Sequence, residues 1–429
     1  MTAAIFALLP LVLPLYAVRL RIGPLPMTLL EVALIALIAA WTWSRRGAGW
    51  RNGWMRLERE GWLAPLGLWL LAGTLGVMVA PDHLGALGLW RAYFLEPALI
   101  FVMLADLLGS SQLTRPHQFR NGMCVLVRSL VVINILVALW AVMQMFGLLP
   151  IPSPWDVPPT GIRATGPFPY PNALALFAVP IAGLCVSLLS FPTSPFRLLV
   201  NDRIILIVGI GSGLVATLLA RSDGGLVALA AAAFVALVLR KTTRVPTVVA
   251  TVLLGLALLA IPATRTAVAD QLLFRGWSGK VRLVMWDETV TMLKDRPLFG
   301  AGLGAYPDVI APYHAATWME IFQYPHHILL NLWSETGLLG VVAFGWILVL
   351  WIRRGGRTAL PVIAAIAVHG LVDVPYFKND LAILFWILVA VTAFPSPVIP
   401  AKAGTPPPVI PAPPPSVIPA QAGIQKTNL

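Results

Sequence analysis

Long apolar runs recur along the chain and restrict its fold more than any other feature of the sequence. Each run has around 20 residues, the length at which an α-helix crosses the hydrocarbon core of a bilayer. Only 11% of the 429 residues are charged, whereas a soluble domain averages about 25%. The sequence therefore predicts an all-α polytopic membrane protein. We place its twelve transmembrane segments near residues 3–18, 27–44, 62–80, 90–108, 125–147, 171–191, 203–220, 224–240, 245–262, 329–352, 358–374 and 380–394.

Arginine and lysine cluster in every second connection between these runs. Such clusters mark cytoplasmic connections, so both chain termini are expected on the cytoplasmic side. Arg19 and Arg21, after the first run, are the exception. The net charge of +12 is thereby explained by orientation in the membrane, and no nucleic-acid partner is expected. The clusters are Arg45, Arg46, Arg51, Arg56 and Arg59; Arg115, Arg120 and Arg128; Arg197 and Arg203; Arg240, Lys241 and Arg244; and Arg353, Arg354 and Arg357.

With this orientation the chain divides into four parts. Residues 1–262 contain transmembrane helices 1–9, and residues 263–327 form one large periplasmic loop between spans 9 and 10. Residues 328–394 contain transmembrane helices 10–12. Residues 395–429 repeat a unit rich in proline and alanine. Proline at that density prevents a helix and predicts an extended, solvated tail.

Two adjacent histidines precede the tenth span. Because proline is favoured at the first helical position, Pro325 predicts that His326 and His327 lie in the first helical turn. The free N–H groups there bind anions, and the dipole favours a neutral imidazole that accepts a proton. His327, Asn331 and Glu335 then share one face of the helix at i, i+4 and i+8. The alternative is a hydrogen-bonded interfacial histidine with a glutamate packed toward the bundle interior.

Three arginines in the predicted outer segments are candidates for binding an anion. Arg282 lies in a helical stretch of the large loop, Arg221 in a sharp turn, and Arg163 in a loop rich in proline and glycine. A guanidinium binds phosphate through two parallel hydrogen bonds. The alternative for each is a solvated charge or an anchor to lipid headgroups, with Arg221 also able to pair with Asp223.

Two further polar residues lie at the same predicted membrane edge. Asn172 opens the sixth span, and Asp373 ends the eleventh. Polar groups at or within the membrane edge are costly, which makes both residues functional candidates. Asp373 either orients a basic neighbour or caps the span that follows.

The sequence contains no recognisable cofactor or metal motif. Residues 300–304 read GAGLG, which matches neither dinucleotide-binding nor Walker patterns, so we expect a tight turn after Pro297. Adjacent side chains on a helix diverge by ~100°, and no HxxxH or HExxH spacing accompanies His326 and His327. We therefore expect no cofactor and no metal.

Four stretches of the sequence resemble the O-antigen ligase/polymerase superfamily of bacterial inner-membrane proteins. The most specific covers residues 326–340, which read HHILLNLWSETGLLG and resemble the signature HNxxLxxxxExGxxG. His326 stands at the position of the signature histidine, and His327 stands where asparagine is usual. The other stretches are residues 278–306, SGKVRLVMWDETVTMLKDRPLFGAGLGAY; residues 163–177, RATGPFPYPNALALF; and residues 369–377, HGLVDVPYF.

The turn that opens the eighth span departs from the family pattern. The family commonly has Ser-Arg-Gly-Ala there, whereas this chain has Ser222-Asp223-Gly224-Gly225. Arg221 lies two places before the expected arginine. Either Arg221 replaces that arginine in space, or the protein handles its phosphate differently.

The resemblance implies a GT-C-like fold and a metal-independent glycosyltransferase in the bacterial inner membrane, with a periplasmic active site. The donor would be a glycan on undecaprenyl pyrophosphate, and the acceptor a hydroxyl of lipid A–core, as for an O-antigen ligase, or of a growing glycan. It implies that His326 is the base and that Arg282 and Arg221 bind the departing pyrophosphate. Substrate contacts are expected from Arg163, Asn172, His327, Glu335 and Asp373.

Other functions remain open at this point. A polysaccharide polymerase and a protein O-oligosaccharyltransferase share these motifs, so the acceptor is undecided. A transporter of lipid-linked glycans would place charges and broken helices near the bilayer midplane, often with internal repeats. A membrane scaffold without chemistry would leave the stripe of His327 and Glu335 unexplained.

Overall fold

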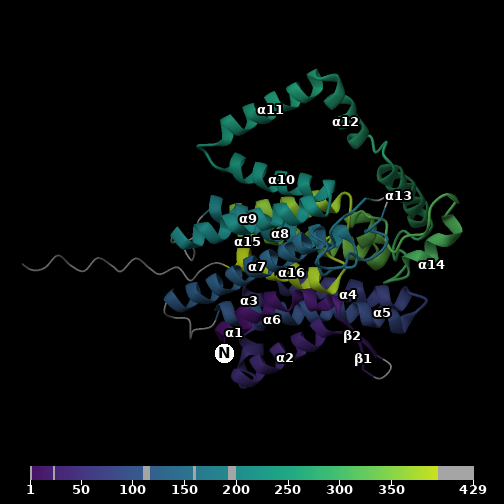
Figure 1. The fold of residues 1–429 in the computed structure, drawn as a ribbon. Helices are drawn as coiled ribbons and strands as arrows, with labels where there is room; N and C mark the ends of the chain where they lie inside the picture. The colour runs from purple at the N-terminus through teal and green to yellow at the C-terminus, as the bar shows by residue number, and fades with distance from the viewer. Residues whose placement is uncertain (1, 23–24, 110–115, 158–160, 192–199, 395–429) are drawn as a thin grey trace, which may run out of the picture. The chain divides into compact units, whose positions relative to one another are not determined.

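The computed structural model describes residues 2–22, 25–109, 116–157, 161–191 and 200–394. The tail at 395–429 lies outside these described residues. The described residues are almost entirely helical and belong to one compact unit, Met1–Ser396 (Figure 1). Strands β1 (Arg19–Ile22) and β2 (Leu25–Thr28) form an antiparallel pair between the first two predicted spans. This pair was not predicted from the sequence.

The helices of the predicted spans follow the apolar runs closely. The first half of the chain contains α1 (Thr2–Leu11), a 3₁₀ turn η1 (Leu13–Ala17), α2 (Leu29–Ser44), α3 (Ala48–Arg59), α4 (Leu63–Val79), α5 (His83–Trp90), a π turn η2 (Arg91–Leu95), α6 (Glu96–Gly109), α7 (Pro116–Met145) and α8 (Pro171–Ser190). The second half contains α9 (Val200–Leu219), α10 (Asp223–Leu239), α11 (Arg244–Ala260), α12 (Pro262–Leu272), α13 (Trp277–Asp295), α14 (Tyr306–Ile310), a 3₁₀ turn η4 (Ala311–Tyr313), α15 (Ile328–Gly370) and α16 (Asn379–Ala393).

Several of these helices are able to cross a membrane. By length and composition, five described helices qualify, or up to seven spans if each of two bent pairs counts as one. The bent pairs are α3 with α4 and α11 with α12, at 104° and 105°. A multi-pass helical membrane protein is therefore confirmed, while the count of twelve stays a prediction.

Helix α15 reverses direction within its 43 residues. A straight helix of that length would extend about 65 Å, yet a Cβ placed on Gly370 would lie 2.8 Å from Cγ2 of Ile328, at the other end. The reversal occurs at Gly356, whose φ of 52° and ψ of −134° are accessible to glycine. Gly337, with φ 67° and ψ −173°, is a second non-helical position, so α15 contains three helical stretches. The break at Gly356 lies between the predicted spans 329–352 and 358–374.

Side-chain contacts sort the connections into two ends of the bundle. At one end, Arg45 after α2 hydrogen-bonds Asp106 near the end of α6 at 2.8 Å. Ser187, near the end of α8, donates to the carbonyl of Thr358, next to the reversal of α15. Arg56 of α3 lies over the ring of Phe394 after α16. Trp351, before the reversal of α15, donates to Thr392 near the end of α16, so these connections lie at the same end.

The polar loops meet at the opposite end. The amide of Ala164 donates to the carbonyl of Leu219 at 3.0 Å, which joins the loop before α8 to the end of α9. Gln271 of α12 donates to Asp223 at the start of α10 at 3.1 Å. This separation of basic connections from polar loops is the one that the alternating charge pattern predicted.

Burial differs sharply among the helices. Every residue of α16 is buried, so this helix lies in the centre of the bundle. By contrast, α11 has no buried residue and exposes valine and leucine around its surface. An exposed helix that is apolar all round is suited to contact with lipid.

An aromatic cluster in the core fixes the chain between α15 and α16. Trp69 of α4 packs on Phe94 and Tyr376, with ring centroids 4.6 and 5.4 Å apart. Its indole N–H donates to the hydroxyl of Tyr376 at 3.1 Å, and that hydroxyl donates to the carbonyl of Tyr93 at 2.8 Å. The segment that carries Asp373 is thereby held against the core.

The glycine-rich turn at 300–304 joins the outer loop to the bundle, as the sequence predicted for a tight turn. Gly300, Gly302 and Gly304 all have positive φ, of 66°, 95° and 74°. The amide of Ala301 donates to the carbonyl of Ser334 at 2.7 Å, and that of Gly304 donates to the carboxylate of Glu335. Glu335 is therefore occupied with holding this turn.

We predict that Gly300→Ala destabilises the fold by at least about 2 kcal/mol. A Cβ there would combine a positive φ with a 2.3 Å approach to the carbonyl oxygen of Trp333. The measurement is the thermal unfolding midpoint of the purified protein in one detergent. The control is Gly276→Ala, because a Cβ at Gly276 meets nothing within 4 Å; equal midpoints for the two variants would contradict the prediction.

Candidate active site

The chain approaches α15 in a strained conformation. His326 has a φ of 46°, in the left-handed region that residues other than glycine rarely adopt. His327 is the N-cap of α15, and its Nδ1 accepts a hydrogen bond from the amide of Leu329 at 3.2 Å. The helix begins at Ile328, so the prediction that both histidines lie in its first turn is wrong. The physical reason is the left-handed residue, which separates Pro325 from the helix.

His326 is paired with a buried carboxylate. Its Nδ1 lies 3.3 Å from Oδ1 of Asp373, just beyond the end of α15, and the two side chains are 19% and 1% exposed. A carboxylate only accepts hydrogen bonds, so Nδ1 carries the proton and Nε2 presents its lone pair. This arrangement holds the imidazole in the tautomer that a general base requires.

Asp373 is stabilised as an anion from several directions. Its Oδ1 accepts from the amide of Val374 at 2.9 Å, and its Oδ2 accepts from the side-chain amide of Asn172 at 3.0 Å. Burial alone would raise the pKa of Asp373, but its interactions with His326 and His369 and the hydrogen bond from the Val374 amide hold the pKa below its ordinary value. Asp373 therefore stays ionised opposite His326.

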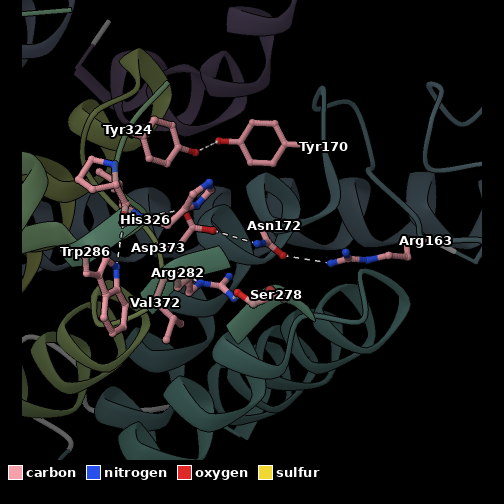
Figure 2. A network of polar contacts seen from close by, with 12 residues as sticks. Arg163, Tyr170, Asn172, Ser278, Arg282, Trp286, Tyr324, His326, Val372 and Asp373 are labelled. Carbon is pink, nitrogen blue, oxygen red and sulfur yellow. Dashed lines mark hydrogen bonds and ion pairs between the residues drawn. The ribbon is translucent and has the colours of Figure 1, made fainter. Parts of the chain in front are cut away.

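Asn172 connects the carboxylate to the first arginine. Its Oδ1 accepts from Nη2 of Arg163 at 3.1 Å, so Arg163, Asn172, Asp373 and His326 form one chain of polar contacts (Figure 2). Nε of Arg163 donates to the carbonyl of Ala220 at 3.0 Å. Burial lowers the pKa of Arg163, but a guanidinium stays charged at any physiological pH.

Arg282 approaches the same carboxylate from helix α13, which the sequence predicted as a helix. Its Nε donates to the carbonyl of Val372 at 2.9 Å, and its Nη1 donates to the hydroxyl of Ser278 one turn earlier. Burial is the main cause that lowers the pKa of Arg282, and the negative charge of Asp373 opposes it. The guanidinium is thus fixed beside the residue that holds His326.

A pocket of about 760 Å³ brings the three arginines together. Arg163, Arg221 and Arg282 all line it, with Asn172 and Asp373. Arg221 lies in the turn before α10 with a φ of 47°. Among the residues that the structure describes, none of these arginines forms an ion pair with a carboxylate. The apolar part of the lining is Leu226, Val227, Phe274, Trp277, Val368, Leu371 and Val372.

Two predicted substrate residues lie apart from this pocket. His327 packs its ring against Trp286, at 5.3 Å between centroids, and Trp286 donates to the carbonyl of Pro325 at 2.9 Å. Burial lowers the pKa of His327. Glu335 is held by the amide of Gly304. Neither His327 nor Glu335 is among the residues that line the pocket, and His326 adjoins it only through its contact with Asp373.

Two tyrosines and a lysine beside His326 were not predicted from the sequence. The hydroxyls of Tyr170 and Tyr324 lie 2.8 Å apart, and the ring of Tyr324 lies 4.7 Å from that of His326. The ammonium of Lys378 lies 3.9 Å from the centroid of the Tyr170 ring. Both tyrosines directly precede a proline, which favours an extended backbone and was a signal available in the sequence. No comparable pattern in the sequence pointed to Lys378.

Among the described residues, no group of three or more histidine, cysteine, aspartate or glutamate side chains is arranged to hold a metal ion. The guanidinium and amide groups of the pocket match phosphate oxygens in charge and hydrogen bonding, and the lining also contains the carboxylates of Asp223, Asp270 and Asp373 and the imidazole of His369. The fold and this site define a multi-pass membrane protein with a cationic pocket beside a histidine–carboxylate pair.

Comparison with known families agrees with this description. Residues 206–345 match the family model of O-antigen ligase. The match confirms the predicted O-antigen ligase/polymerase superfamily, whose members are glycosyltransferase-like enzymes. It includes Arg221, Arg282 and His326, whereas Asn172 and Asp373 lie outside it. No curated protein matches the chain.

We predict that Asp373→Asn lowers stability at neutral pH and removes part of its acid dependence. A carboxyl with a depressed folded-state pKa contributes stability above its unfolded pKa of about 3.9, and that contribution is lost as the pH falls through the folded-state value. The thermal midpoint of the variant should lie about 2–4 °C below the wild type at pH 7, and the gap should narrow below about pH 4.

The matched control for this prediction is Asp270→Asn, which removes an exposed carboxylate 3.4 Å from Arg275. Its midpoint should stay close to that of the wild type, because exposed ion pairs contribute little. A gap for Asp373→Asn that is constant from pH 7 to pH 3 would contradict the prediction.

Proposed function

We propose that the protein is a periplasm-facing glycosyltransferase of the O-antigen ligase type. It would move a glycan from undecaprenyl pyrophosphate to an acceptor hydroxyl, with lipid A–core as the acceptor. The observation that carries the proposal is the pocket itself: it gathers three guanidiniums that have no paired carboxylate among the described residues, and one of its lining residues, Asp373, fixes the tautomer of His326.

The chemistry needs a base and a place for negative charge. Nε2 of His326 removes the proton of the acceptor hydroxyl, while Nδ1–H stays bonded to Asp373, which stabilises the imidazolium that forms. The acceptor oxygen forms a bond to the anomeric carbon, and the bond from that carbon to the pyrophosphate oxygen breaks. The electron pair leaves with the pyrophosphate, so the transfer balances without another reactant.

The arginines stabilise the negative charge that develops on the pyrophosphate as it leaves. Arg163 and Arg282 are fixed by backbone carbonyls before the substrate arrives, so little reorganisation is needed when the bond breaks. Arg221 lines the same pocket as Arg282. This supports the interpretation that Arg221 replaces in space the family arginine that is missing at position 223.

Two observations support a lipid-borne donor that is used on the periplasmic side. The pocket combines arginines with apolar side chains such as Leu226 and Val227, which suits an amphiphilic ligand. The basic connections lie at the opposite end of the bundle, and such connections face the cytoplasm. The pocket would then open toward the periplasm.

The matched superfamily includes both ligases and polymerases, and these two kinds of enzyme differ in the acceptor that they use. Deleting the gene and profiling lipopolysaccharide and lipid-linked glycans tests the proposal directly. A ligase deletion should accumulate full-length polymer on the lipid carrier, whereas a polymerase deletion should accumulate single repeat units. No change in either pool would overturn the proposed function.

We predict that His326→Ala lowers kcat for glycan transfer by about 10²–10⁴-fold, because the general base is lost. The measurement is transfer by purified protein in detergent or proteoliposomes, with the amount of folded protein matched. The control is His83→Ala, since His83 contacts only the carbonyl of Val77 among the described residues. Full activity of His326→Ala would place the base elsewhere, with His327 as the first candidate.

We predict that Arg282→Lys loses at least about tenfold in kcat/KM, because an ammonium cannot reproduce the planar, multi-donor geometry of a guanidinium. Arg275→Lys is the matched control on the same outer segment, where an exposed arginine lies 3.4 Å from Asp270. Equal turnover by both variants would assign Arg282 to structure alone.

A further inference from the structure

Two tyrosines form a hydrogen-bonded pair beside His326. Tyr170 directly precedes α8 and Tyr324 lies two residues before His326, and their hydroxyl oxygens are 2.8 Å apart. Burial is the main cause that raises the pKa of both phenols well above the ordinary value, so both stay protonated. Figure 2 shows this pair on the side of His326 away from Arg282.

The two tyrosine hydroxyls carry two protons, and the hydrogen bond between them uses only one. One hydroxyl donates to the other, and the hydroxyl that accepts keeps its own O–H. Among the described residues that O–H has no further acceptor. It is therefore available to a ligand next to the imidazole of His326, 4.7 Å from the Tyr324 ring.

Lys378 adds a cation to this group. Its ammonium stacks on the Tyr170 ring at 3.9 Å and is buried without a hydrogen-bond partner among the described residues. Burial lowers the pKa of Lys378 to about 8, and the carboxylates of Asp380 and Asp373 oppose that shift. Oδ1 of Asp380 is likewise buried without a partner in the described part of the chain.

Buried polar groups are nearly always hydrogen-bonded, so unpartnered ones in a single place point to a ligand or to ordered water. Here the open groups are a phenol O–H, an ammonium and a carboxylate oxygen. A phosphate would satisfy only the donors and would be repelled by Asp380. A sugar hydroxyl both donates and accepts, so adjacent hydroxyls can satisfy all three groups.

We propose that Tyr170, Tyr324 and Lys378 form the subsite that binds the acceptor sugar. The assignment rests on the proposed function, because it takes the arginine pocket as the site of the lipid pyrophosphate. An inverting displacement needs the attacking oxygen and the leaving group on opposite faces of the reacting sugar, with the base on the attacking side. In Figure 2, Arg282 and the tyrosine pair lie on different sides of the His326–Asp373 pair, which agrees with that geometry.

The experiment compares Tyr324→Phe, Tyr170→Phe and Lys378→Met with the wild type. Transfer is measured with undecaprenyl pyrophosphate carrying one repeat unit as the donor, and with either lipid A–core or a lipid-linked glycan as the acceptor. Each variant should raise KM for one of these acceptors about five- to tenfold, as expected for one lost hydrogen bond. KM for the donor should stay unchanged, and direct binding of the same acceptor without donor should weaken by a similar factor.

Tyr313→Phe is the matched control, because it removes a phenol that donates to Asp295 at 2.9 Å elsewhere on the outer segment. Its KM for both substrates should match the wild type. A variant that folds with unchanged acceptor KM and acceptor binding, or that raises donor KM equally, overturns the subsite. Absence of transfer by the unmodified protein with both acceptors would instead overturn the proposed function, while the binding measurement still decides whether these residues hold a sugar.

Discussion

A buried carboxylate at the membrane edge is the constraint on which the rest of the site depends. Burying the charge of Asp373 is unfavourable unless hydrogen bonds and an opposite charge compensate it. The compensation comes from the adjacent amide of Val374, from Asn172 at the start of α8 and from His326 before α15. These groups lie on separate segments of the chain, so the packing of the helices is what brings the site residues together.

Two pairs of arginines in the described bundle differ in what holds them. Arg45 and Arg128 pair with Asp106 and Asp202 at 2.8 and 2.6 Å, at the basic end of the bundle, where the ion pairs hold helices together. Arg163 and Arg282 are held instead by backbone carbonyls. A carbonyl fixes the direction of a guanidinium but leaves its charge in place, so the pocket keeps a positive potential for an anionic ligand.

The sequence predicted those parts of the molecule that depend on local pattern. Hydrophobic period and charge alternation located the helices, the helix that carries Arg282 and the end at which the polar loops meet. The contact between Asn172 and Asp373 joins residues 201 positions apart, and no pattern in one sequence reports such a pairing. Likewise, the spacing of His327 and Glu335 on one helical face predicted a shared role. The carboxylate of Glu335 instead accepts a hydrogen bond from the amide of Gly304 in the glycine-rich turn. The left-handed backbone of His326 depends on its tertiary contacts, so helix-start rules placed it wrongly.

The two adjacent histidines have different environments and so different chemistry. The Nδ1 of His326 faces the carboxylate of Asp373, which fixes the tautomer of the imidazole. His327 is half-buried against Trp286 without a carboxylate at its ring, and its burial lowers its pKa. Its Nδ1 accepts from the amide of Leu329, which is the capping contact that an asparagine oxygen makes at a helix start. A histidine at the position where the family signature has asparagine therefore preserves the cap, and the proposed base is the residue before it, His326.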